Sequence, residues 1–504
     1  MKPNRWHWKQ IAIISVLIAL LLGSNLVAYH LGSSRPVGEA PSEGAYPEKG
    51  VPPDGDHFSE AMEQFVQVLE KISRDYLEPV TLDRLLEGAI EGTLKVLDDP
   101  QTCYYDSSRL EDFMIETTGL FSGVGVRLAE IGDQTWVLAL FPGSPAERAG
   151  LNAGDRLISV DGTAISGESL QRAADLIRGP PGTPVKVAVE RPGVTGPLEI
   201  TIQREEVKVE TVFSRVKEPG IGYIQITGFE RSTGASFIRQ LEALEETDGL
   251  GKGLILDLRN NAGGLLEEAL QIAGELVPEG EITRLVDRRG EVLDIHHSYS
   301  SGKPYPLVVL INEESASASE VIAGALQDHR AALLVGETTY GKATVQNLED
   351  LAGGGALKLT VAKYLTPSGY DLHGQGLKPD YPLKLPEAFK HYDTFFPGVL
   401  ERGDWGLEVE LLQQMLKELN IKPVTPSGYF DSDTAEALAD FQRDCGLEAD
   451  GILDSLTALR LRQAMEQLLA ENDPQLELAR NLLVNPAHSF SKGGEAAAWN
   501  LYRN

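Results

Sequence analysis

The sequence predicts an α/β multidomain protein, in which a core of alternating strands and helices is joined to helical regions at both ends. Between residues 207 and 390, apolar β-branched runs alternate with helical patterns, as is typical of an α/β domain. Residues 11–29 form one long apolar segment, and residues 397–470 show helical periodicity. The length of 504 residues allows about three domains at ~150 residues each.

The composition excludes some classes of function. The formal net charge is −30, from 75 acidic and 45 basic side chains, and this argues against a nucleic-acid partner, which favours basic surfaces. The hydrophobic content of 42% is ordinary for folded domains. The two cysteines, Cys103 and Cys445, are far apart and lack metal-type spacing, and no His-Glu-x-x-His motif occurs. We therefore expect neither a cofactor nor a metal.

The N-terminal end predicts a membrane anchor. Residues 11–29 are uncharged, strongly apolar and about as long as a bilayer core requires. Three basic residues precede them, Lys2, Arg5 and Lys9. The positive-inside rule then places residues 1–10 in the cytoplasm and the remainder on the extracytoplasmic side of a single-pass protein. A cleaved signal peptide is the alternative, although no clear Ala-x-Ala site follows. Residues 30–56 are rich in Gly, Pro, Ser and Glu, which predicts a linker.

Residues 57–118 predict a helical region. Apolar residues recur at helical spacing from Phe58 to Leu97, and Pro79 interrupts the pattern, so we expect a second helix over Leu82–Leu97. The residues themselves indicate a packing unit without chemistry.

The most informative stretch runs from Ile311 to Gln346. An apolar strand pattern ends at Ile311, small residues follow, and a helical pattern begins beside Ser317. A serine there would lie at a helix N-terminus, where unpaired N–H groups and the helix dipole favour negative charge. A serine hydroxyl needs a base, and a lysine whose pKa is lowered by burial can serve. Lys342 follows the next apolar run, Ala332 to Val335. Two structural alternatives stay open: Ser317 and Glu320 fit a helix-capping box, and Lys342 fits a surface charge.

The string SASASE, followed by GALQD and VGETTYGKATVQ, resembles the carboxyl-terminal processing proteases, a family of Ser-Lys peptidases. Lys342 follows Ser317 by 25 residues, and Gln346 follows Lys342 by four, as in that family. The resemblance implies that Ser317 is the nucleophile, that Lys342 is the general base and that Gln346 orients the lysine. A histidine base is the competing hypothesis, but none of the core histidines lies in a competing motif.

The string DLRNNAGG resembles the DLRxNPGG of the same family, with Ala262 where proline is usual. The resemblance implies that the backbone N–H of Gly263 and that of Ala318, next to the nucleophile, form an oxyanion hole. A tight strand-to-helix turn without a ligand is the alternative for the glycines.

Residues 119–206 resemble a PDZ domain in the strings FPGSPAERAGLNAGDRLISVDG and FSGVGV. The resemblance implies that a peptide C-terminus binds by β-augmentation, with its carboxylate at Val124, Gly125 and Val126. A helix over Ser166–Ile177 would line the groove, and Arg178 at its end is a further peptide-binding candidate. The alternatives are a hairpin turn for the glycines and a dipole-compensating charge for Arg178.

Residues 397–470 predict three helices and resemble a small peptidoglycan-binding domain in their LQxxL, FQ and DG elements. A structural or protein-binding helical module is the alternative, because the turn after GIL departs from that family. Residues 471–504 read as a C-terminal extension.

Together these features predict a bacterial serine endopeptidase, anchored in the cytoplasmic membrane, that acts on protein or peptide substrates through an acyl-enzyme. Peptidoglycan and a second copy of the chain are further expected partners. Two rivals remain: a catalytically silent scaffold that binds peptide ends and cell wall, and a family member with a narrow role in signalling, such as sporulation.

Overall fold

The computed structural model describes residues 55–131, 134–191, 193–247, 250–352, 354–390, 396 and 398–484. Within these ranges no helix is both long and apolar enough to span a bilayer. The anchor predicted at residues 11–29 lies outside the described residues. The chain divides into two units, Met1–Gly88 and Ala89–Asn504.

The N-terminal region forms two helices, α2 (Gly55–Asp75) and α3 (Leu82–Lys95), as the pattern around Pro79 predicts. In α2, Leu69 is buried, whereas Val68 is exposed. The helices therefore present apolar side chains at their surface.

The second unit continues with a short strand and a helix, β1 (Cys103–Tyr105) and α4 (Ser107–Thr118). Helix α4 begins at Asp106, whose side chain accepts a hydrogen bond from the N–H of Arg109, and ends at Gly119 in the left-handed conformation. Both ends of α4 are thus set by local sequence.

A small mixed domain follows. Its strands and helices are β2 (Leu120–Gly123), β3 (Val126–Ile131), β4 (Gln134–Leu140), α5 (Pro145–Arg148), β5 (Arg156–Val160), β6 (Thr163–Ala164), α6 (Leu170–Ile177), β7 (Pro184–Glu190), β8 (Leu198–Gln203) and β9 (Glu205–Lys208). The sheet has the antiparallel order β3-β4-β5-β7-β8, and β2 pairs with β9. Helix α6 begins at Leu170 rather than at the predicted Ser166, because the side chain of Ser169 caps it.

The central sheet has the order β10-β11-β12-β15-β16-β19. Its strands are β10 (Val212–Glu218), β11 (Ile221–Ile226), β12 (Gly253–Asp257), β15 (Leu307–Ile311), β16 (Ala332–Gly336) and β19 (Tyr381–Pro382). Only the β10–β11 pairing is antiparallel, and the remaining pairs are parallel. The alternation of strands with helices confirms the predicted α/β core.

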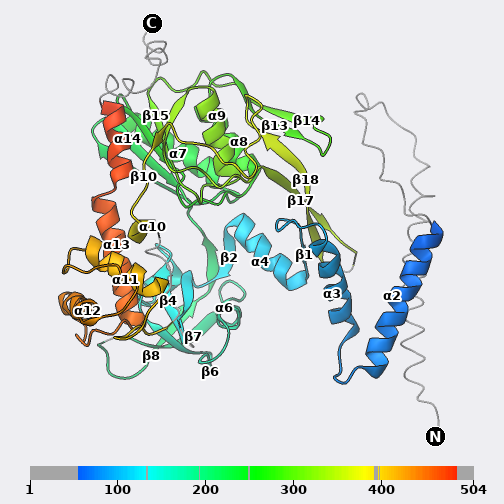
Figure 1. The fold of residues 1–504 in the computed structure, drawn as a ribbon, viewed down its shortest axis with the longest axis horizontal. Helices are drawn as coiled ribbons and strands as arrows, with labels where there is room; N and C mark the ends of the chain where they lie inside the picture. Colours follow the sequence, from blue (N-terminus) through cyan, green and yellow to red (C-terminus); the bar gives the residue numbers. More distant parts are fainter. Residues whose placement is uncertain are drawn as a thin grey trace. The chain divides into compact units, whose positions relative to one another are not determined.

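Side-chain alternation divides the core into two layers. Leu254 and Leu256 pack in the cluster under three helices, α7 (Thr233–Thr247), α8 (Leu266–Leu276) and α9 (Ala318–Asp328). Ile255, between them, packs in a separate cluster on the opposite face. Figure 1 shows α7, α8 and α9 grouped against the strands.

A second, antiparallel sheet of this domain has the order β1-β18-β13-β14, and β17 also pairs with β18. Its further strands are β13 (Gly280–Val286), β14 (Val292–Ser298), β17 (Thr344–Asp350) and β18 (Ala356–Leu365). Strand β17 carries the chain away from Lys342, so this sheet borders the predicted site.

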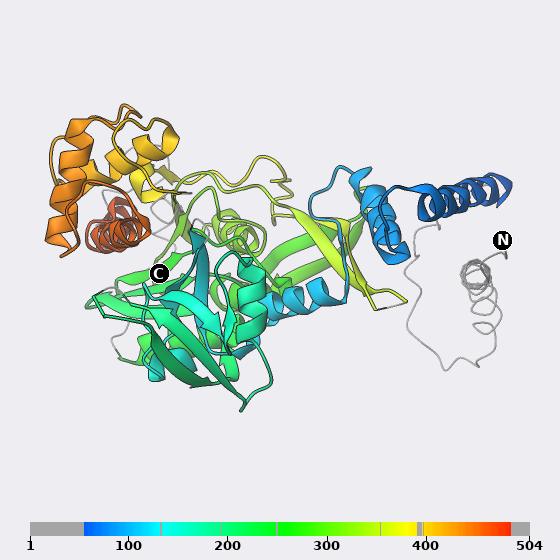
Figure 2. The ribbon, with the colours of Figure 1, turned by 90° about the horizontal axis from the view of Figure 1, so that it is seen from below.

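The C-terminal part is helical, as predicted. Its helices are α10 (Glu387–Lys390), α11 (Leu407–Glu418), α12 (Ser432–Asp444), α13 (Ser455–Glu471) and α14 (Pro474–Val484). Helices α11 to α13 share one core that includes Leu412, Leu438 and Leu461. Figure 2 shows these helices, coloured yellow to orange, grouped together.

Candidate active site

Ser317 occupies the turn between β15 and α9. Its backbone has φ 54° and ψ −113°, a strained conformation for a residue with a side chain. Such strain persists only where the surroundings hold the residue in place, and it is concentrated at functional sites. The neighbouring serines have structural partners: Ser315 Oγ donates to the carbonyl oxygen of Leu258 and Ser319 Oγ to that of Asn261. Of the three serines in SASAS, Ser317 therefore has the backbone conformation that suits a reactive role.

Glu320 joins Ser317 to Lys342. Its buried Oε2 accepts hydrogen bonds from the backbone N–H of Ser317 and from that of Lys342, both at 2.9 Å. Its Oε1 accepts from the N–H of Gly341 at 2.7 Å and from the hydroxyl of Thr339. The carboxylate does interact with the helix start, as the capping alternative requires. It also binds the loop that carries the lysine, which helix capping alone does not explain.

Tyr364, on β18, forms a second link between the same two residues. Its hydroxyl lies 3.1 Å from the carbonyl oxygen of Ser317 and 3.0 Å from that of Lys342, within hydrogen-bond distance of both. Burial raises the pKa of the Tyr364 hydroxyl well above its usual value, and the charge of Glu320 adds to the effect. Tyr364 therefore remains a protonated donor at any working pH.

Lys342 lies in the loop between β16 and β17 and is half-buried. Burial lowers the pKa of its ammonium group, and the like charge of Lys358 lowers it further. The charges of Asp99 and Glu320 act in the opposite direction. The net shift is downward, the direction that a neutral lysine base requires.

Gln346, on β17, lies at the border of the second sheet. Its Nε2 donates to Oγ1 of Thr360 at 3.3 Å. This contact turns the amide nitrogen toward β18 and leaves the side-chain oxygen as an acceptor. That the oxygen orients Lys342 stays a prediction.

Gly263 and Ala318 meet beside Ser317. A Cβ atom added to Gly263 would lie 2.8 Å from Cβ of Ser317 and 3.1 Å from the backbone nitrogen of Ala318, so a side chain has no room here. The N–H of Gly263 donates to Oδ1 of Asn261 at 2.9 Å. The predicted residues are therefore adjacent, but one predicted oxyanion donor is bound to Asn261 in this structure.

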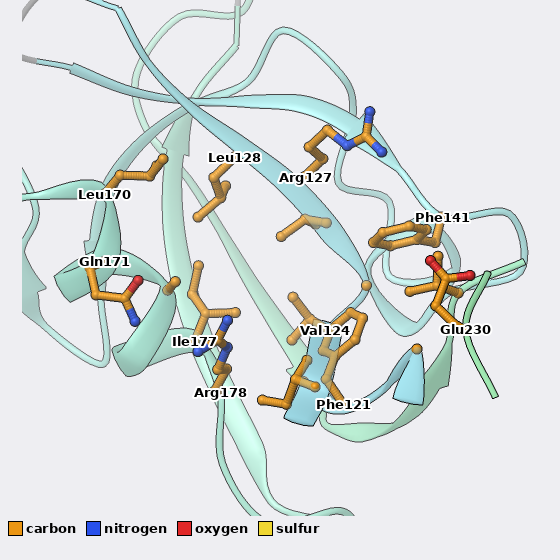
Figure 3. Close-up of a pocket in the computed structure, with 17 residues that line it drawn as sticks. Phe121, Val124, Arg127, Leu128, Phe141, Leu170, Gln171, Ile177, Arg178 and Glu230 are labelled. Carbon is orange, nitrogen blue, oxygen red and sulfur yellow. The ribbon is translucent and has the colours of Figure 1, made fainter. Parts of the chain in front are cut away.

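The predicted peptide-binding residues line a second site, a pocket of about 610 Å³ in the small mixed domain. Val124, Gly125, Val126 and Arg178 all contribute to its wall. Gly125 has a φ of 77°, and an added Cβ atom would lie 2.4 Å from Cβ of Ser144. Figure 3 shows Gln171, Ile177 and Arg178 on one side of this pocket and Phe121 and Phe141 on the other.

Arg178 ends helix α6 and is paired with an acidic residue. Its guanidinium donates to the carboxylate of Asp112 on α4, and Gln171 donates to the same carboxylate at 3.2 Å. Both members of the pair are about one-third exposed. Helix α4 also places Ile115 in the pocket wall. A carboxylate of the chain itself thus lies at the residue that we expect to bind a peptide carboxylate.

Several of these residues were missed in the sequence. Tyr364, Asn261 and Lys358 lie outside the SASASE and VGETTYGKATVQ strings, and from the sequence Glu320 is predicted only as a capping residue. Nδ1 of His373 accepts a hydrogen bond from the backbone N–H of Ala343, next to Lys342, at 3.4 Å. In the described part of the chain, no cluster of three or more His, Cys, Asp or Glu side chains could hold a metal ion.

The Carboxy-terminal processing protease CtpA of Bacillus subtilis (strain 168) is 34% identical over 465 residues, which cover 92% of this chain and 96% of that protein. The chain belongs to the carboxy-terminal processing proteases. Carboxy-terminal processing protease CtpB of the same organism is 34% identical over 84% of this chain and 90% of that protein. A Carboxy-terminal-processing protease of Bartonella bacilliformis is 38% identical over 66% of this chain and 77% of its own length.

Family models divide this carboxy-terminal processing protease into parts. Peptidase family S41 matches residues 220–383, and a PDZ domain model matches residues 136–191. A putative peptidoglycan binding domain matches residues 406–461, and the Activating protease CtpB N-terminal domain matches residues 38–109. The protein is therefore a serine-type peptidase with a PDZ domain and a C-terminal domain of the peptidoglycan-binding type.

Proposed function

We propose that this protease cleaves peptide bonds with Ser317 as nucleophile and Lys342 as general base, through an acyl-enzyme. The observation that carries the proposal is the double link between these residues: Glu320 binds both backbone N–H groups, and Tyr364 contacts both carbonyl oxygens. Two segments of the chain are thereby held together at a helix N-terminus, which favours developing negative charge. The competing scaffold hypothesis leaves the lowered pKa of Lys342 without a role.

The reaction would proceed in two steps. The neutral amine of Lys342 accepts the proton of Ser317 as Oγ attacks the substrate carbonyl carbon, and the resulting ammonium then donates a proton to the leaving amine. Water hydrolyses the acyl-enzyme by the same proton route. The oxyanion is stabilised by the N–H of Ala318 and by that of Gly263, once Gly263 turns away from Asn261. Such donors each contribute a few kcal/mol to the transition state.

A covalent trap tests the nucleophile. The full-length protein is treated with a fluorophosphonate, digested, and analysed by mass spectrometry for the modified residue. We expect the adduct on Ser317 and its loss in Ser317→Ala, together with the loss of turnover of an unfolded protein substrate. An adduct on Ser315 or Ser319, or full turnover by Ser317→Ala, would exclude this assignment.

We further infer that the PDZ pocket binds the C-terminal carboxylate of substrates. One support is that Val124, Gly125, Val126 and Arg178 line the same pocket. The other is that PDZ domains bind peptide ends by β-augmentation, with the peptide carboxylate at backbone N–H groups of a loop. The test compares the affinity of full-length protein for one peptide in its free-acid and amidated forms. Tighter binding of the free acid is expected, and equal affinities would exclude carboxylate capture.

We also propose that residues 11–29 anchor the protease in the cytoplasmic membrane, with the catalytic part on the extracytoplasmic side. The support is the sequence alone, namely the apolar length and the preceding basic residues. Membrane fractionation of cells that produce the full chain or a variant without residues 1–29 tests this. The full chain should sediment with membranes and remain accessible to external protease. A soluble product that has lost the apolar segment by cleavage would contradict anchoring.

For the C-terminal domain we propose peptidoglycan as the ligand. Trp405 and Tyr429 are joined by a β-bridge and are 83% and 52% exposed, and Leu407 beside them is 80% exposed. Rigid exposed aromatic rings provide contact area at low entropic cost. Full-length protein should sediment with purified cell-wall sacculi, Trp405→Ala and Tyr429→Ala should reduce this, and Tyr299→Ala, at another exposed tyrosine, should not. Equal sedimentation of all four proteins would exclude this surface.

A second copy of the chain is a further proposed partner. The exposed apolar side chains of α2, including Phe58, Met62 and Val68, support an interface there. Analytical ultracentrifugation of the protein with and without residues 57–118 measures it. A monomer at micromolar concentration would contradict the proposal.

A further inference from the structure

Helix α14, which follows the peptidoglycan-binding-type domain, returns to the protease core. Its apolar residues share a buried cluster with the face of the central sheet opposite α7 to α9, namely Leu476, Ala479, Leu482 and Leu483. Their partners on the sheet include Ile255, Val308 and Leu310. Figure 1 shows α14 beside β15. The helix therefore supplies the second layer of the core sheet.

The start of α14 also contacts a buried arginine of the core. Nη2 of Arg259 is paired with Asp473 at 2.7 Å, and Nη1 donates to Oε1 of Gln475 at 2.9 Å. The side chains of Arg259 and Asp473 are only 12% and 6% exposed. Gln475 in turn donates to the carbonyl oxygen of Leu383, just after the last strand of the sheet, at 2.6 Å. Polar contacts thus join the helix to two separate parts of the core.

Arg259 lies at the start of the loop that joins β12 to α8 and carries Gly263. On its other side, the guanidinium binds Asp257, the last residue of β12, through Nε at 2.9 Å and through Nη2 at 2.6 Å. The next two residues, Asn260 and Asn261, bind Asn312 and the N–H of Gly263, respectively. A change in the position of Arg259 would therefore be transmitted directly to the Gly263 loop.

A buried charge needs an oppositely charged partner and hydrogen bonds for its remaining polar atoms. The N–H groups of the Arg259 guanidinium bind the carboxylates of Asp257 and Asp473 and the amide oxygen of Gln475. Asp473 and Gln475 lie 214 and 216 positions after Arg259 in the chain. Removing one partner from such a group leaves an uncompensated charge in the interior. The Arg259 side chain would then move toward other acceptors or toward solvent.

We propose that Asp473 and Gln475 are positioning residues of the peptidase, which hold Arg259 and, through it, the loop of Asn261 and Gly263 against Ser317. The domain at residues 397–470 is accordingly inserted into the protease, between the last strand of the core sheet and a helix that completes it. The inference rests on the proposed role of Ser317 as nucleophile.

The test uses full-length Asp473→Asn and Gln475→Met. Asparagine can still accept the N–H groups of Gln475 and Leu476, as Asp473 does, but it carries no charge for Arg259. Methionine keeps the size of Gln475 without its amide. The matched control is Glu477→Gln, on the exposed side of α14, where Glu477 binds Arg480.

Three quantities are measured: kcat, KM and the inhibition constant of a peptide aldehyde, which forms a tetrahedral adduct with the nucleophile. Thermal melting and titration with the fluorophosphonate give the folded, active fraction. We expect kcat and aldehyde affinity to fall in parallel by about tenfold while KM is unchanged, because the loop acts on the oxyanion and not on the ground state. The control should match the wild type.

The inference is overturned if both variants keep wild-type kcat and aldehyde affinity, or if activity falls only in proportion to the folded fraction. If Asp473→Asn does not fold, the test rests on Gln475→Met, which leaves the charges intact. Wild-type kcat and aldehyde affinity in that variant would then overturn the inference. A wild-type protein that is labelled at a serine other than Ser317 would instead contradict the proposed function.

Discussion

Oε2 of Glu320 accepts a hydrogen bond from the backbone N–H of Lys342 at 2.9 Å, across 22 residues of sequence. The same oxygen accepts the N–H of Ser317 at the same distance. Hydrogen bonds from N–H groups to a buried carboxylate are stronger than those between neutral groups. The relative position of the proposed nucleophile and base therefore depends on a carboxylate that binds the backbone of both residues.

Replacing Glu320 by glutamine should lower both activity and stability. A glutamine carries one acceptor oxygen and turns its NH2 group toward backbone donors, so at least one of the four contacts is lost. We expect kcat to fall at least tenfold and the free energy of unfolding to fall by about 1–3 kcal/mol. Enzyme kinetics and denaturant unfolding measure these changes, and Glu314→Gln, at an exposed position in the same loop, is the control. Wild-type kcat in Glu320→Gln would show that this carboxylate does not position the pair.

The pH dependence of kcat/KM should respond to two charges around Lys342. Lys358 lowers the pKa of Lys342, so Lys358→Met should raise that pKa and move the rise of activity to higher pH. Asp99 raises the pKa, so Asp99→Asn should move the rise to lower pH. The control is Lys363→Met, on the same strand but paired with Asp371. Shifts in the same direction for both variants, or none, would exclude Lys342 as the titrating base.

Asp112 should compete with substrate carboxylates for Arg178. The exposed ion pair must open before the guanidinium can bind a peptide C-terminus, and pairs of this kind contribute about 0–1 kcal/mol. Asp112→Asn should therefore tighten the binding of a free-acid peptide by a few-fold and leave the amidated peptide unchanged, as isothermal titration calorimetry of the full-length proteins would measure. Weaker binding of the free acid by Asp112→Asn would show that Asp112 assists, rather than opposes, peptide capture.

The sequence predicted the features that depend on local order. Periodicity and Pro79 indicated the two N-terminal helices, and alternating patterns indicated the α/β core. The SASASE string and its spacing to Lys342 selected two residues that the structure joins through Glu320. Within the PDZ domain, the string FSGVGV selected Val124, Gly125 and Val126, which line one pocket together with Arg178.

Features that depend on packing between distant parts of the chain could not be predicted from local sequence patterns. Tyr364 reaches Ser317 and Lys342 only because β18 pairs with β17, and a register of strands is not visible in a local pattern. Helix α14 could be expected as a helix, but its apolar face did not specify which surface would cover it. The hydrogen bond from Gly263 to Asn261 depends on a side-chain rotamer, which no spacing encodes.

The central claim is that Lys342 is a neutral base for Ser317, and the most direct test is the pH dependence of kcat/KM for the wild type beside Lys342→Arg. Because the pKa of Lys342 is lowered, wild-type activity should rise with pH through that pKa and then level off, as the amine loses its proton. Arginine keeps its charge at any usable pH. Lys342→Arg should therefore lower kcat/KM by roughly 1,000-fold, the order of magnitude expected when a general base is removed. If Lys342→Arg retains near-normal turnover with the same pH profile, lysine is not the base and the Ser-Lys mechanism is wrong.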